Sequence, residues 1–162
     1  MLAFKRQQQE DKRKNMLADN LKCVLACSYA LAVKAQNFHW NVEGPDFPQY
    51  HEFFGNLYEE INGNAIDRTA EFIRTLDEYS PGSFSRFLEL SKIPEQTRIP
   101  RAELMMQELY NDNLTMVDTL NEAFAAAEEE NQQGIANFIA ERLDAHGKHS
   151  WMLRSILKRQ RA

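Results

Sequence analysis

The sequence predicts an all-α protein, a four-helix bundle with a short extra helix in the long connection between the second and third helices. Three observations lead to this fold class. Apolar residues recur at spacings of three and four along four long segments, which is the period of an amphipathic helix. All five prolines lie between residues 45 and 100, where they separate these segments. No stretch alternates apolar and polar residues between turn signals, as a half-buried strand would.

Each of the four long segments carries apolar or small residues on one face. The first stripe contains Leu17, Leu21, Val24, Ser28, Leu31 and Ala35, and the second contains Phe54, Leu57, Tyr58, Ile61, Ala65, Ile66, Ala70 and Ile73. The third contains Met105, Leu109, Met116, Val117, Leu120, Phe124 and Ala127, and the fourth contains Ile135, Phe138, Ile139, Leu143, Ser150, Leu153 and Leu157. Packing these stripes together gives the bundle its core.

The connection between the second and third helices is long, covering residues 80–100, and it includes the short helix expected at Phe84–Leu90. A four-helix bundle with one long crossover has the ferritin-like topology. The 162 residues fit a single domain, with enough chain for a substantial core. We therefore expect one domain over residues 1–162, with a short basic N-terminal tail of about residues 1–14.

Composition restricts the location and the partners. The chain is 43% hydrophobic and 27% charged, as is ordinary for a soluble globular protein, and its formal net charge is -5. We expect no segment long and apolar enough to cross a bilayer, and the N-terminus lacks the apolar core of a signal peptide. These features predict a cytoplasmic protein with no membrane partner. Cys23 and Cys27, four residues apart in a helix, are interpreted as small buried residues without a disulfide.

Basic residues gather at both ends of the chain. They are Lys5, Arg6, Lys12, Arg13, Lys14, Lys158, Arg159 and Arg161. Either end could make a non-specific contact with DNA phosphates. This contact would be weak because few counterions are released, and high salt would remove it. The alternative is that these side chains only solvate the termini or complement a helix C-terminus.

Candidate metal ligands lie within residues 37–76. His39 ends one helical segment and His51 begins the next, so two packed helices could bring the imidazoles together. Asp67 and Glu71 are spaced i,i+4 and share one helical face. Two imidazoles and two carboxylates suit iron or zinc. The alternatives are that the histidines are hydrogen-bonded core residues, and that Asp67 and Glu71 form salt bridges with the nearby Arg68 and Arg74.

The same stretch resembles a known signature. HWNVEGPDFPQYHEFF, from His39, and IDRTAEFI, from Ile66, are similar to the Dps family, the mini-ferritins that protect DNA during starvation. SFSRFLELSKIPE resembles that family's short helix, and ERLDAHGKHSWMLRSIL resembles its final helix. The resemblance extends from about residue 20 to residue 157.

The resemblance implies a hollow homo-oligomer, a dodecamer, that stores iron in the cytoplasm and can associate with the nucleoid. In this family Fe(II) is oxidised preferentially by hydrogen peroxide at a site between two subunits. His39 and His51 would come from one chain, and Asp67 and Glu71 from its neighbour. The sequence contains no Glu-x-x-His pair, which disfavours a di-iron site inside one bundle. Trp40 could donate an electron to the site, although core packing is its default role.

The sequence departs from the family pattern at two positions in this helix. The family usually has a carboxylate where Gly55 stands, so one ligand is missing and space is expected beside His51. Asp67 also follows His51 by one residue more than usual, which predicts a π-bulge at Asn62, Gly63 and Asn64. On this basis, Gly55→Asp is expected to tighten metal binding and stabilise the helix. The alternatives are a structural shell or DNA-associated protein whose oxidation site has decayed, and a bundle that binds zinc or another divalent ion without turnover.

Overall fold

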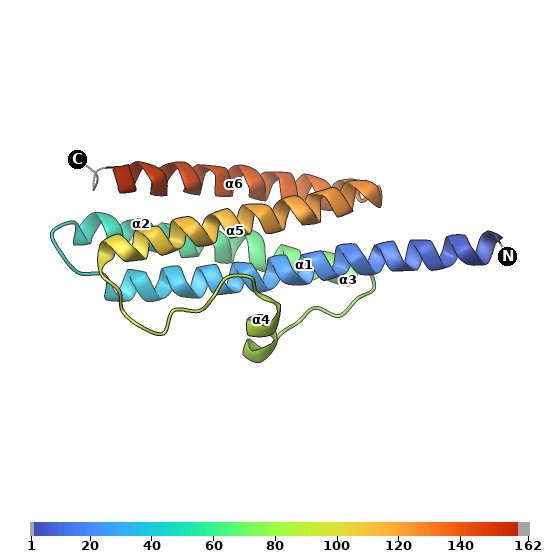
Figure 1. Ribbon diagram of the computed structural model, residues 1–162, viewed down its shortest axis with the longest axis horizontal. Helices are drawn as coiled ribbons and strands as arrows, with labels where there is room; N and C mark the ends of the chain where they lie inside the picture. Colours follow the sequence, from blue (N-terminus) through green and yellow to red (C-terminus); the bar gives the residue numbers. More distant parts are fainter. Residues whose placement is uncertain (1, 159–162) are drawn as a thin grey trace.

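The computed structural model describes the backbone of residues 2–158 and the side chains of Lys5 and residues 16–158. In chain order the elements are α1 (Leu2–Asn41), α2 (Phe47–Ile61), the π-helical segment η1 (Asn62–Ile66), α3 (Asp67–Thr75), α4 (Phe84–Leu90), α5 (Ala102–Glu129) and α6 (Gln133–Lys158). Because α2, η1 and α3 are contiguous, they form one long second helix (Figure 1). The predicted all-α bundle with a short helix in its long connection is confirmed, and no strand occurs among these residues.

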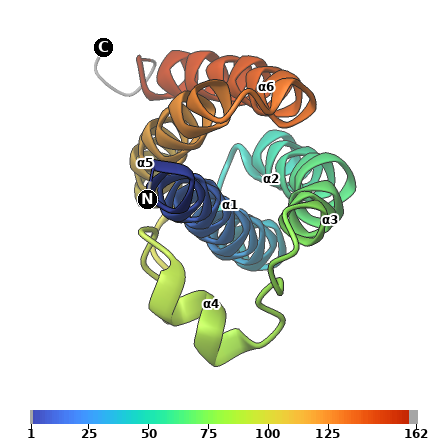
Figure 2. The ribbon, with the colours of Figure 1, turned by 90° about the vertical axis from the view of Figure 1, so that its right-hand side faces the viewer.

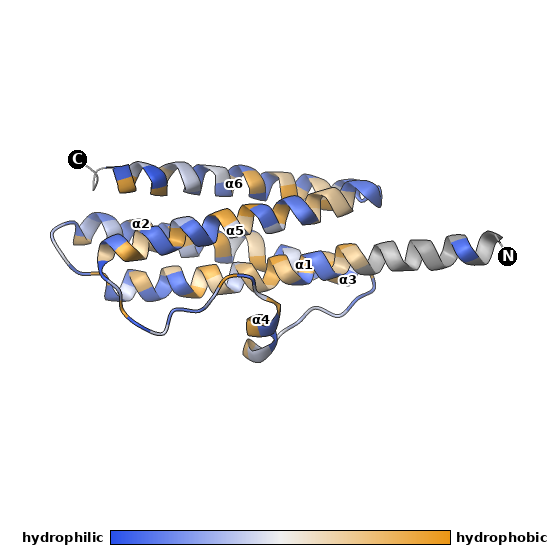
Figure 3. Ribbon diagram, in the orientation of Figure 1, coloured by the Kyte–Doolittle hydropathy of each residue, from blue (hydrophilic) through white to orange (hydrophobic). Residues whose placement is uncertain are grey.

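Seen end-on, α1, α2–α3, α5 and α6 surround a common core, and α4 lies outside the bundle beside α1 (Figure 2). Apolar positions recur along each long helix (Figure 3). The largest fully buried side chains include Phe38, Phe54, Phe138, Leu21, Leu25, Met105 and Leu109. Burying each such side chain contributes roughly 1.5–3 kcal/mol, so packing of the stripes supplies most of the stability of the helices.

Local sequence sets several of the helix ends. The helix α3 ends at Thr75, and Asp77 then adopts a left-handed φ of 63°. This turn lets the Glu78 amide donate to the Ile73 carbonyl at 3.3 Å. Asn131 does the same between α5 and α6 with a φ of 57°. Aspartate and asparagine tolerate this conformation better than most residues, so they can replace the glycine that is usual after a helix.

The basic ends are only partly described. Residues 2–14, predicted as a basic tail, form the first part of α1, which projects beyond the other helices (Figure 1). Lys5 and Lys158 are exposed. The other basic groups named above lie outside the described residues: the side chains of Arg6, Lys12, Arg13 and Lys14, and the residues Arg159 and Arg161. The predicted contact with DNA therefore stays a prediction.

One helical segment passes a length and hydropathy test for crossing a membrane, contrary to the expectation from the sequence. It is Met16–Asn41, with a mean hydropathy of 1.4 in its most apolar window. Of that window, 56% is buried inside the protein. A buried core helix passes the same test, and this segment packs against α2, α3, α4 and α5.

The two cysteines are free thiols. Cys27 is fully buried, as predicted, and Cys23 is half-buried. The Cys27 sulfur accepts a hydrogen bond from the main-chain amide of Lys92 at 3.3 Å. This bond ties the long connection to α1.

Candidate metal centre

His39 and His51 meet where the end of α1 packs against the start of α2. Their rings are stacked, with centroids 3.8 Å apart and planes inclined by 20°. Each ring also bonds to the main chain of the other residue. Nδ1 of His39 lies 2.6 Å from the His51 carbonyl oxygen, and Nδ1 of His51 lies 2.7 Å from the His39 carbonyl oxygen. The prediction that two packed helices bring these imidazoles together is confirmed.

The reciprocal bonds determine which nitrogen of each ring is available. A carbonyl oxygen can only accept, so each Nδ1 must carry the proton and donate it. Each Nε2 then presents its lone pair, and hydrogen bonding of the other ring nitrogen is how metal-binding histidines are usually oriented. The His39 carbonyl also lies in the last turn of α1, where the helix provides no amide partner, so His51 satisfies an otherwise orphaned acceptor. The pair is thus rigid and leaves two nitrogen ligands free.

Aromatic side chains surround the pair. Phe47 stacks on His51 with centroids 5.1 Å apart, and Tyr58 meets His39 edge-on at 5.4 Å. Trp40, in contrast, is 66% exposed. The expectation that it packs in the core is therefore wrong for a single chain, because the residue follows His39 on the outer side of α1. Its ring is left free to contact another molecule.

Gly55 lies directly beneath His39. A Cβ atom added there would come 3.1 Å from both Cε1 and Nδ1 of the His39 ring. The expectation of free space beside His51 is therefore wrong, because the His39 imidazole fills it. A side chain at this position would require the His39 ring to shift by a few tenths of an ångström against its bond to the His51 carbonyl, so the expected gain in metal binding from Gly55→Asp does not follow. The glycine permits the close approach that the histidine pair requires.

The helix that carries Gly63 contains the predicted irregularity. Residues Asn62–Ile66 form a π-helical segment, and the backbone returns to an α-helix at Asp67. A π-helical turn absorbs one additional residue without breaking the helix. The predicted bulge is confirmed, and the two asparagines and the glycine occupy its exposed side.

Asp67 and Glu71 both lie on the exposed surface of α3. The arginines that could have paired with them bind elsewhere. Arg68 forms an ion pair with Glu141 at 3.1 Å, and Arg74 donates to the Glu78 carbonyl at 2.8 Å. The alternative explanation of Asp67 and Glu71 as salt-bridge partners of these arginines is therefore wrong, and their oxygens remain available to a ligand.

One protomer does not bring the four predicted ligands together. Sixteen positions separate His51 from Asp67, which corresponds to roughly 24 Å along a helix. Among the residues that the structure describes, no group of three or more His, Cys, Asp or Glu side chains is placed to hold a metal ion. The histidine pair and the carboxylate pair lie apart on one chain, and we term each pair a half-site of the site that the sequence predicts.

Sequence analysis missed a polar cluster in the bundle core. Arg142, only 4% exposed, donates to both carboxylate oxygens of Glu60, at 2.5 and 2.9 Å. Nε2 of His149 lies 3.7 Å from the same carboxylate, and Nδ1 of His146 bonds Asn113 at 2.7 Å. Burial alone would raise the pKa of Glu60, but the hydrogen bonds and charge of Arg142 outweigh it and lower that pKa. A guanidinium therefore supplies the cation that balances Glu60 inside the bundle.

The spacing of residues in the sequence could have predicted this cluster. Arg142, His146 and His149 follow one another at spacings of four and three, in the same stripe as Ile139 and Leu153. Polar residues at core positions of a helix are expected to bond one another, because an unpaired buried polar group is costly.

Comparison with known proteins agrees with this architecture. The model of the ferritin-like domain family matches residues 18–162. A low temperature-induced protein of Nostoc sp. is 34% identical over 152 residues, which cover 93% of this chain and 84% of that protein. The DNA protection during starvation protein of Brevibacillus brevis is 34% identical over 128 residues, 79% of this chain and 85% of its own length. The chain belongs to the Dps family of ferritin-like proteins.

A solved Dps structure has the same fold. The Dps protein from Vibrio cholerae O1, described as a member of a broad superfamily of ferritin-like diiron-carboxylate proteins, superposes with a TM-score of 0.85 at 26% identity, covering 90% of this chain and 91% of that one. Membership of the Dps family carries iron storage and DNA protection as functions at the level of the family. The sequence-based prediction assigns any iron chemistry of this Dps-family chain to the two half-sites.

Proposed function

We propose that this protein is a cytoplasmic mini-ferritin that binds Fe(II), oxidises it with hydrogen peroxide and stores the ferric product inside a hollow homo-oligomer. The observation that carries the proposal is the stacked pair of His39 and His51, whose Nδ1 atoms are engaged by carbonyl oxygens and whose Nε2 atoms are free. Asp67 and Glu71 of a neighbouring chain complete the site. Imidazole retains the ferrous substrate, and the hard carboxylate oxygens favour the ferric product.

The separation of the half-sites supports an oligomer. Two α2–α3 helices that run antiparallel across a two-fold axis would place the histidine end of one beside the carboxylates of the other. A closed two-fold interface makes this exchange reciprocal, so each pair of subunits forms two equivalent sites. Assembly is thus a precondition for metal binding, and the dodecamer of the family would provide it.

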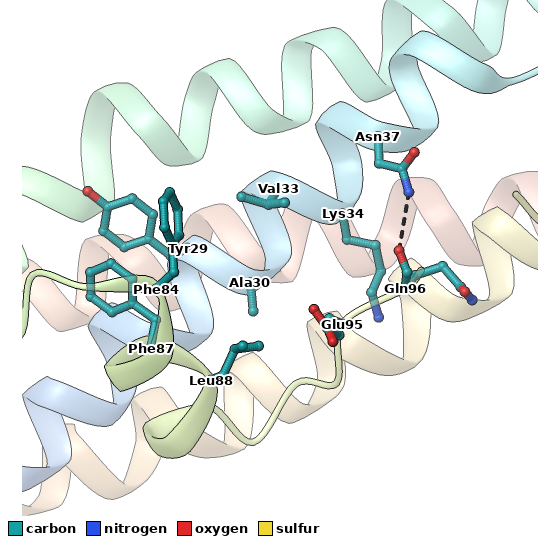
Figure 4. A pocket seen from close by; sticks show the side chains of 10 residues that line it. All are labelled: Tyr29, Ala30, Val33, Lys34, Asn37, Phe84, Phe87, Leu88, Glu95 and Gln96. Atoms are coloured by element: carbon teal, nitrogen blue, oxygen red, sulfur yellow. Dashed lines mark hydrogen bonds between the residues drawn. The ribbon is translucent and has the colours of Figure 1, made fainter. Parts of the chain in front are cut away.

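A second surface feature supports association. A pocket of about 390 Å³ lies between α1 and α4, and it is lined largely by apolar side chains (Figure 4). Val33, Phe84 and Leu88 in this lining are 55%, 82% and 55% exposed. Contiguous exposed apolar side chains of this size are characteristic of protein interfaces. A second subunit covering this face would bury them.

We expect the purified protein to be a closed oligomer at micromolar concentration. The physical reason is that the half-sites and the apolar face of α1 and α4 are each completed only by another chain. Multi-angle light scattering provides the measurement, with a dodecamer near twelve times the mass of the 18.9 kDa chain. A stable monomer would contradict both the shared site and the shell.

Anaerobic loading with Fe(II), followed by hydrogen peroxide, tests the chemistry. We expect rapid formation of ferric absorbance and retention of iron with the oligomer on gel filtration, since oxidation at the inter-chain site feeds a mineral core. Prior saturation with Zn(II), which prefers the same ligands but has no redox chemistry, should slow the reaction. An oligomer that binds Zn(II) or Fe(II) without peroxide-driven oxidation would favour the decayed shell or the zinc-binding bundle. DNA protection would then rest on the basic termini alone.

A further inference from the structure

The helix α6 contacts residues that come before and after the π-helical segment in the chain. Before the segment, Glu60 receives the two hydrogen bonds from Arg142. After it, Arg68 lies over the Phe138 ring, 4.5 Å from the centroid, and its guanidinium pairs with Glu141. Three neighbouring positions of α6 therefore fix the residues that flank Asn62–Ile66.

The two sides differ in burial. Arg68 and Glu141 have exposed side chains, 51% and 64%, and such surface pairs contribute little. The side chains of Arg142 and Glu60 are 5% and 28% exposed, and their two parallel N–H···O bonds restrict both the distance and the orientation. Glu60 also accepts from the Asn64 side chain at 3.3 Å, inside the π-helical segment. The buried pair is thus the stronger restraint, and it extends into the π-helical turn itself.

The register of the helix decides where Asp67 points. At roughly 100° per residue, Asp67 lies about 160° around an unbroken α-helix from His51, which is nearly the opposite face. When the π-helical turn absorbs one residue, the angle falls to about 60°. Isolated π-helical turns are rare, so tertiary contacts must favour this one over a continuous α-helix.

We infer that Arg142 is a positioning residue, which through Glu60 holds the π-helical segment and so keeps Asp67 and Glu71 on the face that meets the histidines of a neighbouring subunit. This inference rests on the proposed inter-subunit site. Arg142 itself touches no metal, because it is buried in the bundle core between Glu60 and His146.

Binding of Co(II) to the assembled protein tests the inference in two backgrounds. One is the native chain, and the other is the chain with Gly63 deleted, in which removal of the extra residue leaves a continuous α-helix with Asp67 in the same register. Arg142→Met should weaken Co(II) binding on the order of tenfold in the native chain, as loss of a supporting residue commonly does. In the deletion background it should change the affinity less than twofold. Arg154→Met, an exposed arginine on the same helix, is the matched control.

Comparing Arg142→Met in the two backgrounds separates an effect on the position of Asp67 and Glu71 from a general loss of stability. An equal loss of affinity in both backgrounds, or no loss in either, would overturn the role of Arg142. If Arg142→Met fails to assemble, Glu60→Gln replaces it, since glutamine keeps the shape but loses the charge-assisted pair, and the same two-background outcomes apply. His39→Ala serves as the reference for the site. Co(II) binding that does not depend on His39 would overturn the inter-subunit site, whereas His39-dependent binding that ignores Arg142 would overturn this inference alone.

Discussion

Replacement of both His39 and His51 by alanine is expected to abolish peroxide-driven oxidation of Fe(II) while the bundle remains folded. The double variant removes both nitrogen ligands of the half-site, so we expect Fe(II) affinity to fall by at least about a hundredfold, more than for loss of a supporting residue. Both side chains are half-buried at helix ends, and losing them should cost only about 1–3 kcal/mol of stability. The initial rate of ferric absorbance and the urea unfolding curve provide the two measurements.

A matched double variant separates ligand loss from disturbance of the helix ends. Asn41→Ala with Gln49→Ala changes two exposed polar residues, each two positions from one of the histidines. It should retain the native oxidation rate. Unchanged oxidation in the histidine double variant would remove the ferroxidase assignment and leave a shell protein with the same fold.

Acidification from pH 6.5 to about pH 4 is expected to destabilise the folded chain strongly through the histidines of the core. Burial is the main cause that lowers the pKa of His149 to about 4, with Arg142 and Lys148 acting in the same direction and Glu60 opposing them. Burial, followed by the charges of His149 and Arg142, also lowers the pKa of His146 well below its usual value. In the folded protein both imidazoles are therefore neutral near pH 6.5, and His149 takes up its proton only as the pH approaches 4.

The direction of this change in stability follows from proton binding. Below pH 6.5 the unfolded chain takes up protons at these histidines that the folded chain does not bind, so the free energy of unfolding falls as the pH falls. His149 alone contributes on the order of 3 kcal/mol across the window. Asp112 partly offsets the loss at the acid end, because burial raises its pKa and its protonation favours the folded state. Urea unfolding between pH 4 and pH 7.5 measures the slope, and His149→Gln should flatten it. If the slope of unfolding free energy against pH is unaltered in that variant, His149 is not a cause of the acid sensitivity.

The bundle could be predicted from the sequence because helix periodicity and the positions of prolines act locally. The π-helical segment could be predicted too, since an extra residue must either rotate the rest of a helix or be absorbed within it. The exposure of Trp40 could not, because an aromatic residue at a helix end has no periodicity that distinguishes the core from an interface. The reciprocal bonds of His39 and His51 depend on how two helix ends approach each other, which residue spacing does not encode.

Arg142 was missed for a different reason. The fourth apolar stripe runs through Leu143 and Ser150, which are half-buried and lie next to the buried Arg142 and His149. A hydrophobic pattern assigns charged residues to the surface, whereas here Arg142 is balanced by Glu60 on another helix. Such pairs become visible in a sequence only when opposite charges at core positions of two helices are considered together.

The contact between Gly55 and His39 restricts how this protein can change by mutation. A carboxylate at position 55 is an advantage only if the His39 ring has already moved, and that ring is held by its bond to the His51 carbonyl. The reverse order, in which the ring moves first, breaks the stacked pair without adding a ligand. A carboxylate at position 55 is therefore expected to need a second change that lets the His39 ring shift. This coupling between position 55 and the His39 ring sets a mutational barrier to gaining a carboxylate ligand at the proposed site.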